Sequence, residues 1–552
     1  MKRLKNMRTS TKYIFLAVIL LSVGLGSCQD ELDLAPETQI SDANFWNSPS
    51  DLEKAANYFY SLLPDINDMN DNQGTFSYSN DGADEISDGT RLAGATSGDW
   101  NNAYKLIRAS NNLLEKSENV IGDEASINKY LAEARFFRAW AYAGLVRRFG
   151  DVPLITKTLS ETSEELYGAR TDRQTVIELV YEDLDFAAAN LPMSSAQPAA
   201  EYGRITATAV LAFKSRVALF EGTRAKFHNY GNPNEHLQLA VDAADKVITS
   251  GEHQLFIYNE DPAISFRKLF QDAGDGKSNK EAILVRLYAE NASNNLSSHR
   301  ISENRINQGK MVPTRTLADL YLYQDGLPIG KSPLAKPQTN SLSQFEKRDP
   351  RMEMTIFNSN LYYSPTALYV PSFSFTPTGY KFSKYYDPLY LSPPDSWVDF
   401  QIIRYAEVLL NYAEAKFELN GAIDNADLDK SINLIRARVN MPPLTNAFVA
   451  ANGLDMRIEI RRERAIELAM EEFNYWDLIR WKTAEVELPK TVYGAKYFEA
   501  EYGPATNKLD GENFVIVQAE ADRFFDPARD YLWPIPLQEI GLNSALTQNP
   551  NW

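Results

Sequence analysis

Apolar residues recur at helical spacing through the first half of the chain. One stretch carries them every three or four positions, at Tyr130, Ala134, Phe137, Ala141 and Leu145. Because residues at this spacing fall on one face of a helix, the pattern predicts a buried helix there. Two further helices are predicted over about 206–221 and 235–250, and Gly251 stands where a glycine would end the second one.

Small residues lie among the apolar positions of these predicted helices, at Ala209, Ala212 and Ala218. Small side chains let neighbouring helices approach closely, so the pattern favours helices stacked in pairs. A pair of this kind is the repeating unit of tetratricopeptide proteins, although the repeat signal alone is weak. Residues 51–254 are therefore predicted to form a helical scaffold.

The pattern changes between residues 255 and 400. Proline and glycine become frequent, tyrosine and phenylalanine cluster, and no long apolar stripe continues, which predicts short strands and long loops. Helical spacing returns after 400 and predicts helices over about 402–419, 427–439 and 455–482, followed by an irregular tail. The predicted fold class is mostly α: a tetratricopeptide-like helix-pair scaffold with a loop-rich, short-strand region packed on it.

The first 28 residues have a separate pattern. Basic residues precede an apolar run over 13–21, and small residues follow it, which is typical of a secretory signal. The run is shorter than the ~20 residues that span a membrane. Residues 25–28 (LGSC) resemble the bacterial lipoprotein signal, in which the cysteine becomes the acylated first residue. We expect a signal peptide over 1–27, a lipid anchor on Cys28 and a tether over 28–50; the alternative is an ordinary signal peptide with an incidental cysteine.

The charge of the chain narrows the range of partners. Its formal net charge is −18, and removal of residues 1–27 takes away five basic and no acidic residues, which leaves −23. Nucleic acids and anionic lipid headgroups bind basic surfaces, so we expect no nucleic-acid partner. Because Cys28 is the only cysteine, no disulfide can form within the chain.

The common catalytic motifs are missing from the sequence. The four histidines form no H-E-x-x-H pattern, and neither a phosphate-binding glycine loop nor a G-x-S-x-G turn occurs. We therefore expect no catalytic residues, no metal and no cofactor. A glycosidase remains an alternative, because it needs only two suitably spaced carboxylates.

One predicted helix carries a glutamate at every fourth position, at Glu459, Glu463, Glu467 and Glu471. Like charges at this spacing weaken an isolated helix. The carboxylates could serve metal binding or acid–base chemistry, or they could pair with arginines of this helix and the preceding one. We favour the ion-pair interpretation, because such networks also occur without function.

Several segments resemble the motifs of one protein family. They are residues 100–107 (WNNAYKLI), 133–142 (EARFFRAWAY), 149–154 (FGDVPL), 404–415 (RYAEVLLNYAEA), 462–469 (RERAIELA) and 477–481 (DLIRW). On these segments the chain resembles the SusD/RagB family of outer-membrane nutrient-binding lipoproteins of Bacteroidetes.

The resemblance implies one compact body over 28–552. It would comprise an N-terminal helical part (51–254), an insertion that bears part of the ligand site (255–400) and a C-terminal part (401–552). It also implies an oligosaccharide ligand and a SusC-like TonB-dependent transporter barrel as partner, over which the protein acts as a lid. The expected location is the outer membrane, anchored through acyl chains such as palmitate and exposed at the cell surface.

The resemblance places the ligand site on loops, without a fixed set of contacts. The first such loop is at about 78–99, and others lie in the central region. Aromatic side chains stack on sugar rings, and carboxylate and guanidinium groups pair with hydroxyls. The candidate ligand-binding residues are Asp84, Arg91, Tyr362, Tyr363, Tyr380 and Trp397, whereas Trp100 is expected in the core.

Three other functions remain open at this point. The chain could be a peptide-binding member of the same import system, because aromatic and acidic loops also suit peptides. It could be a helix-repeat scaffold that binds a protein partner, or a glycosidase. The leading hypothesis is a non-catalytic, cell-surface glycan-binding lipoprotein that delivers oligosaccharides to a transporter.

Overall fold

The computed structural model of the protein describes residues 45–290, 296–391 and 395–552. The predicted signal peptide, Cys28 and most of the tether lie outside these residues. Within the described part, none of the helices combines the length and the apolar character needed to cross a membrane.

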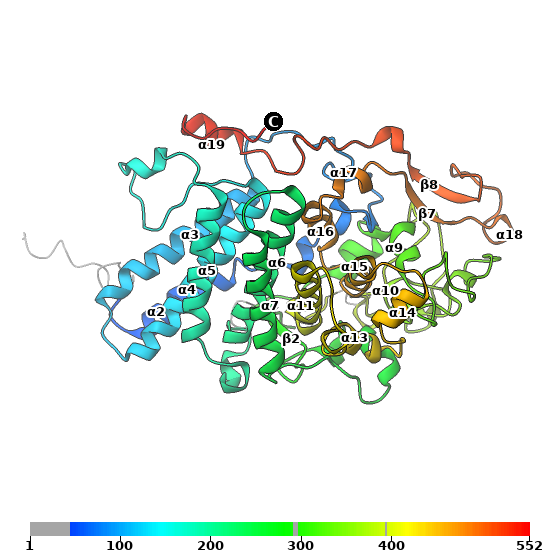
Figure 1. Ribbon diagram of the computed structural model, residues 1–552, viewed down its shortest axis with the longest axis horizontal. Coiled ribbons are helices and arrows are strands. Elements are labelled where there is room, and N and C mark those ends of the chain that lie inside the picture. Colours follow the sequence, from blue (N-terminus) through cyan, green and yellow to red (C-terminus); the bar gives the residue numbers. More distant parts are fainter. Residues whose placement is uncertain (1–44, 291–295, 392–394) are drawn as a thin grey trace, which may run out of the picture.

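Long helices fill one half of the molecule and its centre (Figure 1). In chain order they are α2 (Pro49–Tyr60), α3 (Gly98–Lys116), α4 (Glu124–Phe149), α5 (Arg173–Asn190), α6 (Ala207–His228), α7 (Pro233–Thr249), α11 (Tyr405–Asn420) and α15 (Met456–Glu467). Helices α3 to α7 pack each against the next, α7 packs on α11, and α11 packs on α15. The predicted mostly-α fold with a helix-pair scaffold is confirmed.

Helix ends follow the local sequence. The Ser97 hydroxyl accepts a hydrogen bond from the Trp100 amide and so caps the start of α3 (3.4 Å). Gly251 follows α7 with a φ of +69°, as predicted, and Gly421 ends α11 with a φ of +71°. Helix α6 is longer than predicted, because it ends only at the left-handed Asn229.

Two large hydrophobic cores and two smaller ones lie within the described residues. The first extends through the helical scaffold and buries the predicted stripe, including Phe137 and Leu145. Trp100 belongs to this core, as expected, and its ring meets that of Phe149 edge to face at 5.1 Å. The second core lies under the loop-rich region and includes Phe382. The loop-rich region is therefore a packed body rather than a set of loose connections.

Short strands pair in the described part as four two-stranded antiparallel ladders. The pairs are β1 (Ser77–Tyr78) with β3 (Val312–Pro313), β2 (Ala282–Arg286) with β6 (Phe400–Arg404), β4 (Tyr362–Ser364) with β5 (Ala367–Leu368), and β7 (Val492–Lys496) with β8 (Phe514–Gln518). The strands between 255 and 400 agree with the prediction. The β7–β8 hairpin, on the right of Figure 1, corrects the prediction of an irregular tail.

Short helices connect these parts. They are α8 (Ser265–Lys268), α9 (Arg315–Leu320), α10 (Arg351–Thr355), α12 (Asn425–Asp429), α13 (Ile432–Arg438), α14 (Asn446–Ala451), α16 (Asn474–Arg480), α17 (Ala484–Glu487), α18 (Glu499–Tyr502) and α19 (Leu537–Leu542). Helix α19 lies along one edge of the molecule, at the top of Figure 1.

Three further predicted helices had wrong bounds. The helix predicted over 402–419 begins only at Tyr405, because residues 400–404 form β6 and pair with β2. The helix predicted over 427–439 is divided at Ser431 into α12 and α13. The helix predicted over 455–482 is divided into α15 and α16, and between them Met470 and Glu472 adopt positive φ.

The glutamates that recur at every fourth position, from Glu459 to Glu471, take part in a buried ion-pair network. Glu463 pairs with Arg351 and Arg436, both at 2.7 Å. Glu467 pairs with Arg351 at 3.0 Å and with Arg404 at 2.6 Å. Burial alone would raise the pKa of Glu467, but Arg438, Arg404 and Arg351 lower it below its usual range. The ion-pair interpretation is confirmed, with Arg351 and Arg404 as partners that the sequence did not indicate.

Candidate functional site

The loop between β1 and α3 carries two of the predicted ligand-binding residues, and the C-terminal segment holds it in place. Arg523 donates to the Ser87 carbonyl (2.8 Å), and the Phe524 amide donates to the Asp88 carbonyl (2.9 Å). Asp84 is half-buried, and its two carboxylate oxygens accept from the Asn70 side chain (3.0 Å) and the Ile86 amide (2.9 Å). Asp84 therefore shapes the loop.

Arg91, the second predicted residue of this loop, is buried in a stack of aromatic rings. Its guanidinium lies 4.8 Å from the Trp533 ring and 4.9 Å from the Trp552 ring. Arg148 lies between Trp476 and Trp533, 5.2 Å from each ring. Burial lowers the pKa of Arg91. Because the stack covers Arg91, we leave it out of the proposed site and assign it to anchoring the C-terminal segment.

Asp71 lies just ahead of β1 and holds that segment to the chain after α15. Its carboxyl is buried and accepts a hydrogen bond from the Met470 amide at 3.2 Å. Burial, together with the nearby charge of Glu472, raises the pKa of Asp71 to about 8. The group is therefore protonated in the folded protein at neutral pH.

Replacing Asp71 with Asn should remove a pH dependence of stability. Folding binds a proton at Asp71 between its ordinary pKa near 4 and its raised one, so the wild-type protein loses stability as pH rises, by ~1.4 kcal/mol per unit for one group. The Asp71→Asn variant carries no such proton. Urea unfolding between pH 5 and 7 should show the free energy of unfolding of the variant rising relative to that of the wild type by about this amount per pH unit. Parallel curves would contradict the assignment.

The four predicted aromatic residues occupy different environments. Tyr362, on β4, is 59% exposed. Tyr363 is half-buried; its hydroxyl donates to the Asn307 side chain (3.0 Å) and its ring stacks on Tyr386 at 5.6 Å. Trp397 is half-buried against the second core.

Tyr380 does not face solvent, because it is only 4% exposed and its hydroxyl donates to Gln344 at 2.7 Å. A sugar has no access to this ring, and we leave Tyr380 out of the proposed site. The many aromatic residues near Tyr380 in the sequence suggested a sugar-stacking surface, but the ring is buried in the second core.

Exposed apolar residues that the sequence did not single out lie on the β4–β5 hairpin and in the chain that follows it. Leu368 pairs with Tyr362 across the β4–β5 ladder and is exposed, as is Val370. Phe375 follows in the next loop and is 74% exposed. Exposed apolar groups that gather in this way typically mark a binding surface.

Polar residues from two other segments adjoin the chain at Phe375. Gly309 brings these segments together. A Cβ atom placed on Gly309 would lie 2.9 Å from the Phe375 carbonyl oxygen and 3.2 Å from the Asn80 side-chain nitrogen. The backbone N–H of Asn80 donates to the Gly309 carbonyl (2.9 Å), and its side-chain NH₂ donates to the Gln308 carbonyl. Asp81 forms an exposed ion pair with Lys310.

We call Tyr362, Leu368, Val370, Phe375, Asn80, Asp81, Gln308 and Lys310 the aromatic surface. It combines exposed rings with amide, carboxylate and ammonium groups. Sugar rings offer the complementary features, apolar faces and a rim of hydroxyls. The arrangement can therefore hold an oligosaccharide without chemistry on it.

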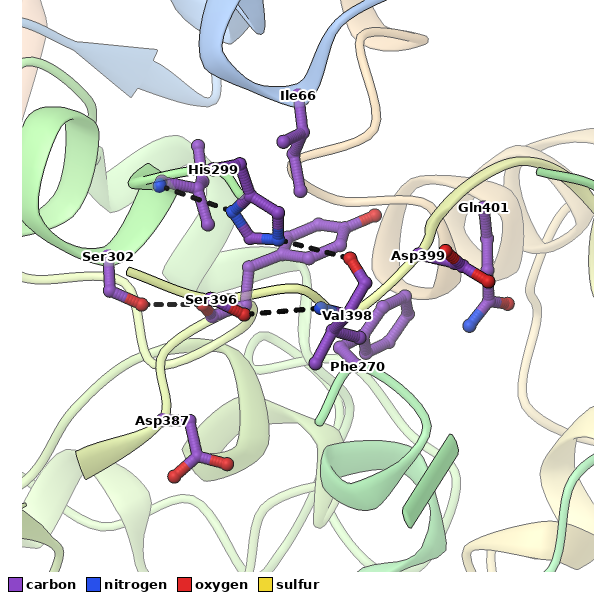
Figure 2. Close-up of a pocket in the computed structure, with 11 residues that line it drawn as sticks. Ile66, Phe270, His299, Ser302, Asp387, Ser396, Val398, Asp399 and Gln401 are labelled. Carbon is purple, nitrogen blue, oxygen red and sulfur yellow. Dashed lines mark hydrogen bonds between the residues drawn. The ribbon is translucent and has the colours of Figure 1, made fainter. Parts of the chain in front are cut away.

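The histidines serve internal hydrogen bonds. Figure 2 shows His299 in a small cavity, where its Nε2 donates to the Val398 carbonyl at 3.0 Å. Burial lowers the pKa of His299 to about 4, so the ring is neutral. The cavity measures about 10 Å³, which is room for about one water molecule. Across the described residues, no cluster of three or more histidine, cysteine or acidic side chains is arranged to hold a metal ion.

Comparison with protein families gives two matches. Residues 280–552 match the model described as the SusD family. Residues 37–219 match the model described as starch-binding associating with outer membrane. The two matches do not overlap and together span most of the chain.

Individual relatives and solved structures agree with these matches. The chain is 26% identical to a SusD-like protein of Formosa agariphila, over 88% of this chain and 93% of that protein. It resembles the crystal structure of a SusD-like carbohydrate-binding protein from Bacteroides fragilis, with 27% identity, a TM-score of 0.76 and coverage of 91% of this chain and all of that one. A laminarin-binding SusD-like protein, at 20% identity and a TM-score of 0.63, shares the fold over 92% of this chain and all of its own.

Proposed function

This chain belongs to the SusD/RagB family, and on that premise we propose that it binds oligosaccharides on its aromatic surface. The observation that carries the proposal is the exposure of Tyr362 and Phe375, together with the polar side chain of Asn80 that lies near the Phe375 backbone. Exposed rings beside polar groups offer a sugar both an apolar platform and hydrogen-bonding partners.

The proposal includes a place in the cell and a partner. The protein is attached to the outer membrane through acyl chains on Cys28 and faces the outside. It acts as the lid of a SusC-like TonB-dependent transporter barrel and passes captured oligosaccharides to it. The family description that mentions outer-membrane association and the lipoprotein-like residues 25–28 support this placement.

Affinity electrophoresis on gels that contain intact polysaccharides tests the binding step. We expect the purified protein to be retarded by at least one neutral or acidic polysaccharide and to migrate freely in a gel without polymer. Reducing ends should not appear when protein and polymer are incubated together, because the protein binds without cleaving. Release of reducing sugar would establish the glycosidase alternative instead.

Two further outcomes would redirect the proposal. If peptides shift the thermal midpoint of the protein and polysaccharides do not, the chain is a peptide-binding member of the import system. If neither ligand binds but the protein captures a protein partner over a large area, it is a scaffold. Co-purification with its transporter from outer membranes tests the lid role separately.

A further inference from the structure

A second pocket lies apart from the aromatic surface, where β2 meets the ends of α5, α6 and α7 (Figure 1). Its volume is about 230 Å³, whereas a cavity that holds one water needs only ~10–15 Å³. None of the residues that line it belongs to the aromatic surface. The pocket is therefore a separate space, large enough for a small organic molecule.

One wall of the pocket is a directed chain of hydrogen bonds. His253 Nδ1 must donate to the Lys280 carbonyl (3.0 Å), because a carbonyl only accepts. Burial lowers the pKa of His253, so its Nε2 is free of a proton and accepts from the Thr208 hydroxyl (2.8 Å). Thr208 in turn accepts from Ser194 at 2.7 Å. The Ser194 oxygen lines the pocket and also lies 3.3 Å from the Thr206 hydroxyl. A hydroxyl oxygen has two lone pairs, so Ser194 can accept from a hydroxyl group of a ligand while it donates to Thr208.

The rim of the pocket carries unbalanced positive charge. Lys277 donates only to the Gln197 carbonyl (2.6 Å), and among the described residues neither Lys277 nor Lys280 forms an ion pair. The carboxylate of Glu252 is occupied by the amide and hydroxyl of Ser195, at 2.6 and 2.8 Å. In a chain with a net charge of −18, two ammonium groups against the single carboxylate of Glu252 leave an excess of positive charge at this rim, which favours an anion.

The floor of the pocket is apolar and comes from strand β2, with Ala282 and Ile283 among its residues. A ligand that complements the hydrogen-bonded wall, the positive rim and the apolar floor needs hydroxyl donors, one negative group and an apolar face. We propose that this pocket binds an anionic sugar unit, one that bears a carboxylate or a sulfate beside its hydroxyls. The site is additional to the aromatic surface and does not depend on it.

Isothermal titration of the protein with glucuronate, glucose 6-sulfate and glucose tests the proposal. We expect at least one of the two anionic sugars to bind at least tenfold more tightly than glucose, with affinity that falls as NaCl is added. The preferred anion shows whether the natural group is a carboxylate or a sulfate. Equal binding of all three sugars, or no heat from any of them, would overturn the site.

Charge reversal at the rim locates the binding. Lys280→Glu should weaken the anionic sugar at least tenfold, and Lys280→Arg should retain it. Lys105→Glu, at an exposed position on α3, is the matched control and should bind like the wild type. Lys280 is exposed, so its variants should keep the wild-type thermal midpoint. An equal loss in both Glu variants, no loss in Lys280→Glu, or a loss on removal of Tyr362 and Phe375 instead would refute the assignment.

Discussion

Replacing Arg404 with Met is expected to lower the free energy of unfolding by about 3–5 kcal/mol at pH 7, the range for a buried ion pair that loses one partner. Arg404 is 1% exposed and lies where β6 meets α11. Its guanidinium contacts Glu281 at 2.9 Å, Glu467 at 2.6 Å and Glu471 at 2.7 Å. The variant would leave these carboxylates buried with less positive charge around them.

The loss should shrink in acid. In the wild type, burial opposes ionisation of Glu471, but Arg404 and Lys384 lower its pKa below the ordinary value. A carboxylate of this kind stabilises the fold above its ordinary pKa, and the stabilisation disappears as pH falls through the lowered one. Without Arg404 the carboxylates can protonate at higher pH, which removes the unpaired charge. Unfolding in urea at pH 7 and pH 5 should therefore give a smaller difference at pH 5.

An exposed ion pair provides the control. Lys490 and Glu487 lie 2.7 Å apart on the surface, and Lys490→Met should change the stability by less than ~0.5 kcal/mol. A similar small effect of Arg404→Met would show that the buried network adds little to stability. A large effect that does not change with pH would mean that lost packing, rather than unpaired charge, is the cause.

The same network explains where sequence reasoning succeeded and where it stopped. The spacing of the glutamates and the nearby arginines was enough to predict an ion-pair network. The spacing continues to Glu471, which also suggested one long helix. The helix ends at Glu467, and Met470 and Glu472 beyond it adopt positive φ. Glu471 pairs with Lys384 and Arg404, and these partners come from other parts of the fold. No periodicity within a segment contains that information.

The candidate site shows the same limit at single residues. Tyr362 and Tyr363 are neighbours on a strand, so one had to face the protein, but the sequence does not tell which. Phe373 and Phe375 have similar neighbours, yet Phe373 packs on Tyr497 and Phe375 is exposed. The partner that distinguishes them lies more than a hundred residues away in the chain.

Replacing both Tyr362 and Phe375 with Ala should reduce the affinity for a bound oligosaccharide about a hundredfold. Aromatic contacts contribute ~0.5–1.5 kcal/mol each beyond the area that they bury, and the lost burial of two rings brings the total to about 3 kcal/mol. Both side chains are mostly exposed, so the fold should be unaffected. Affinity electrophoresis on the polysaccharide that retards the wild type, and titration with its oligosaccharides, measure the loss.

Two exposed rings elsewhere make a matched control. Tyr167 is 62% exposed and Phe524 is 57% exposed, and neither belongs to the aromatic surface. The Tyr167→Ala, Phe524→Ala variant removes the same two types of ring and should bind like the wild type. Full retention by the Tyr362, Phe375 variant would place the ligand elsewhere on the protein. If the control variant lost binding instead, the ligand would lie near Tyr167 or Phe524, because the lost affinity would follow those two rings.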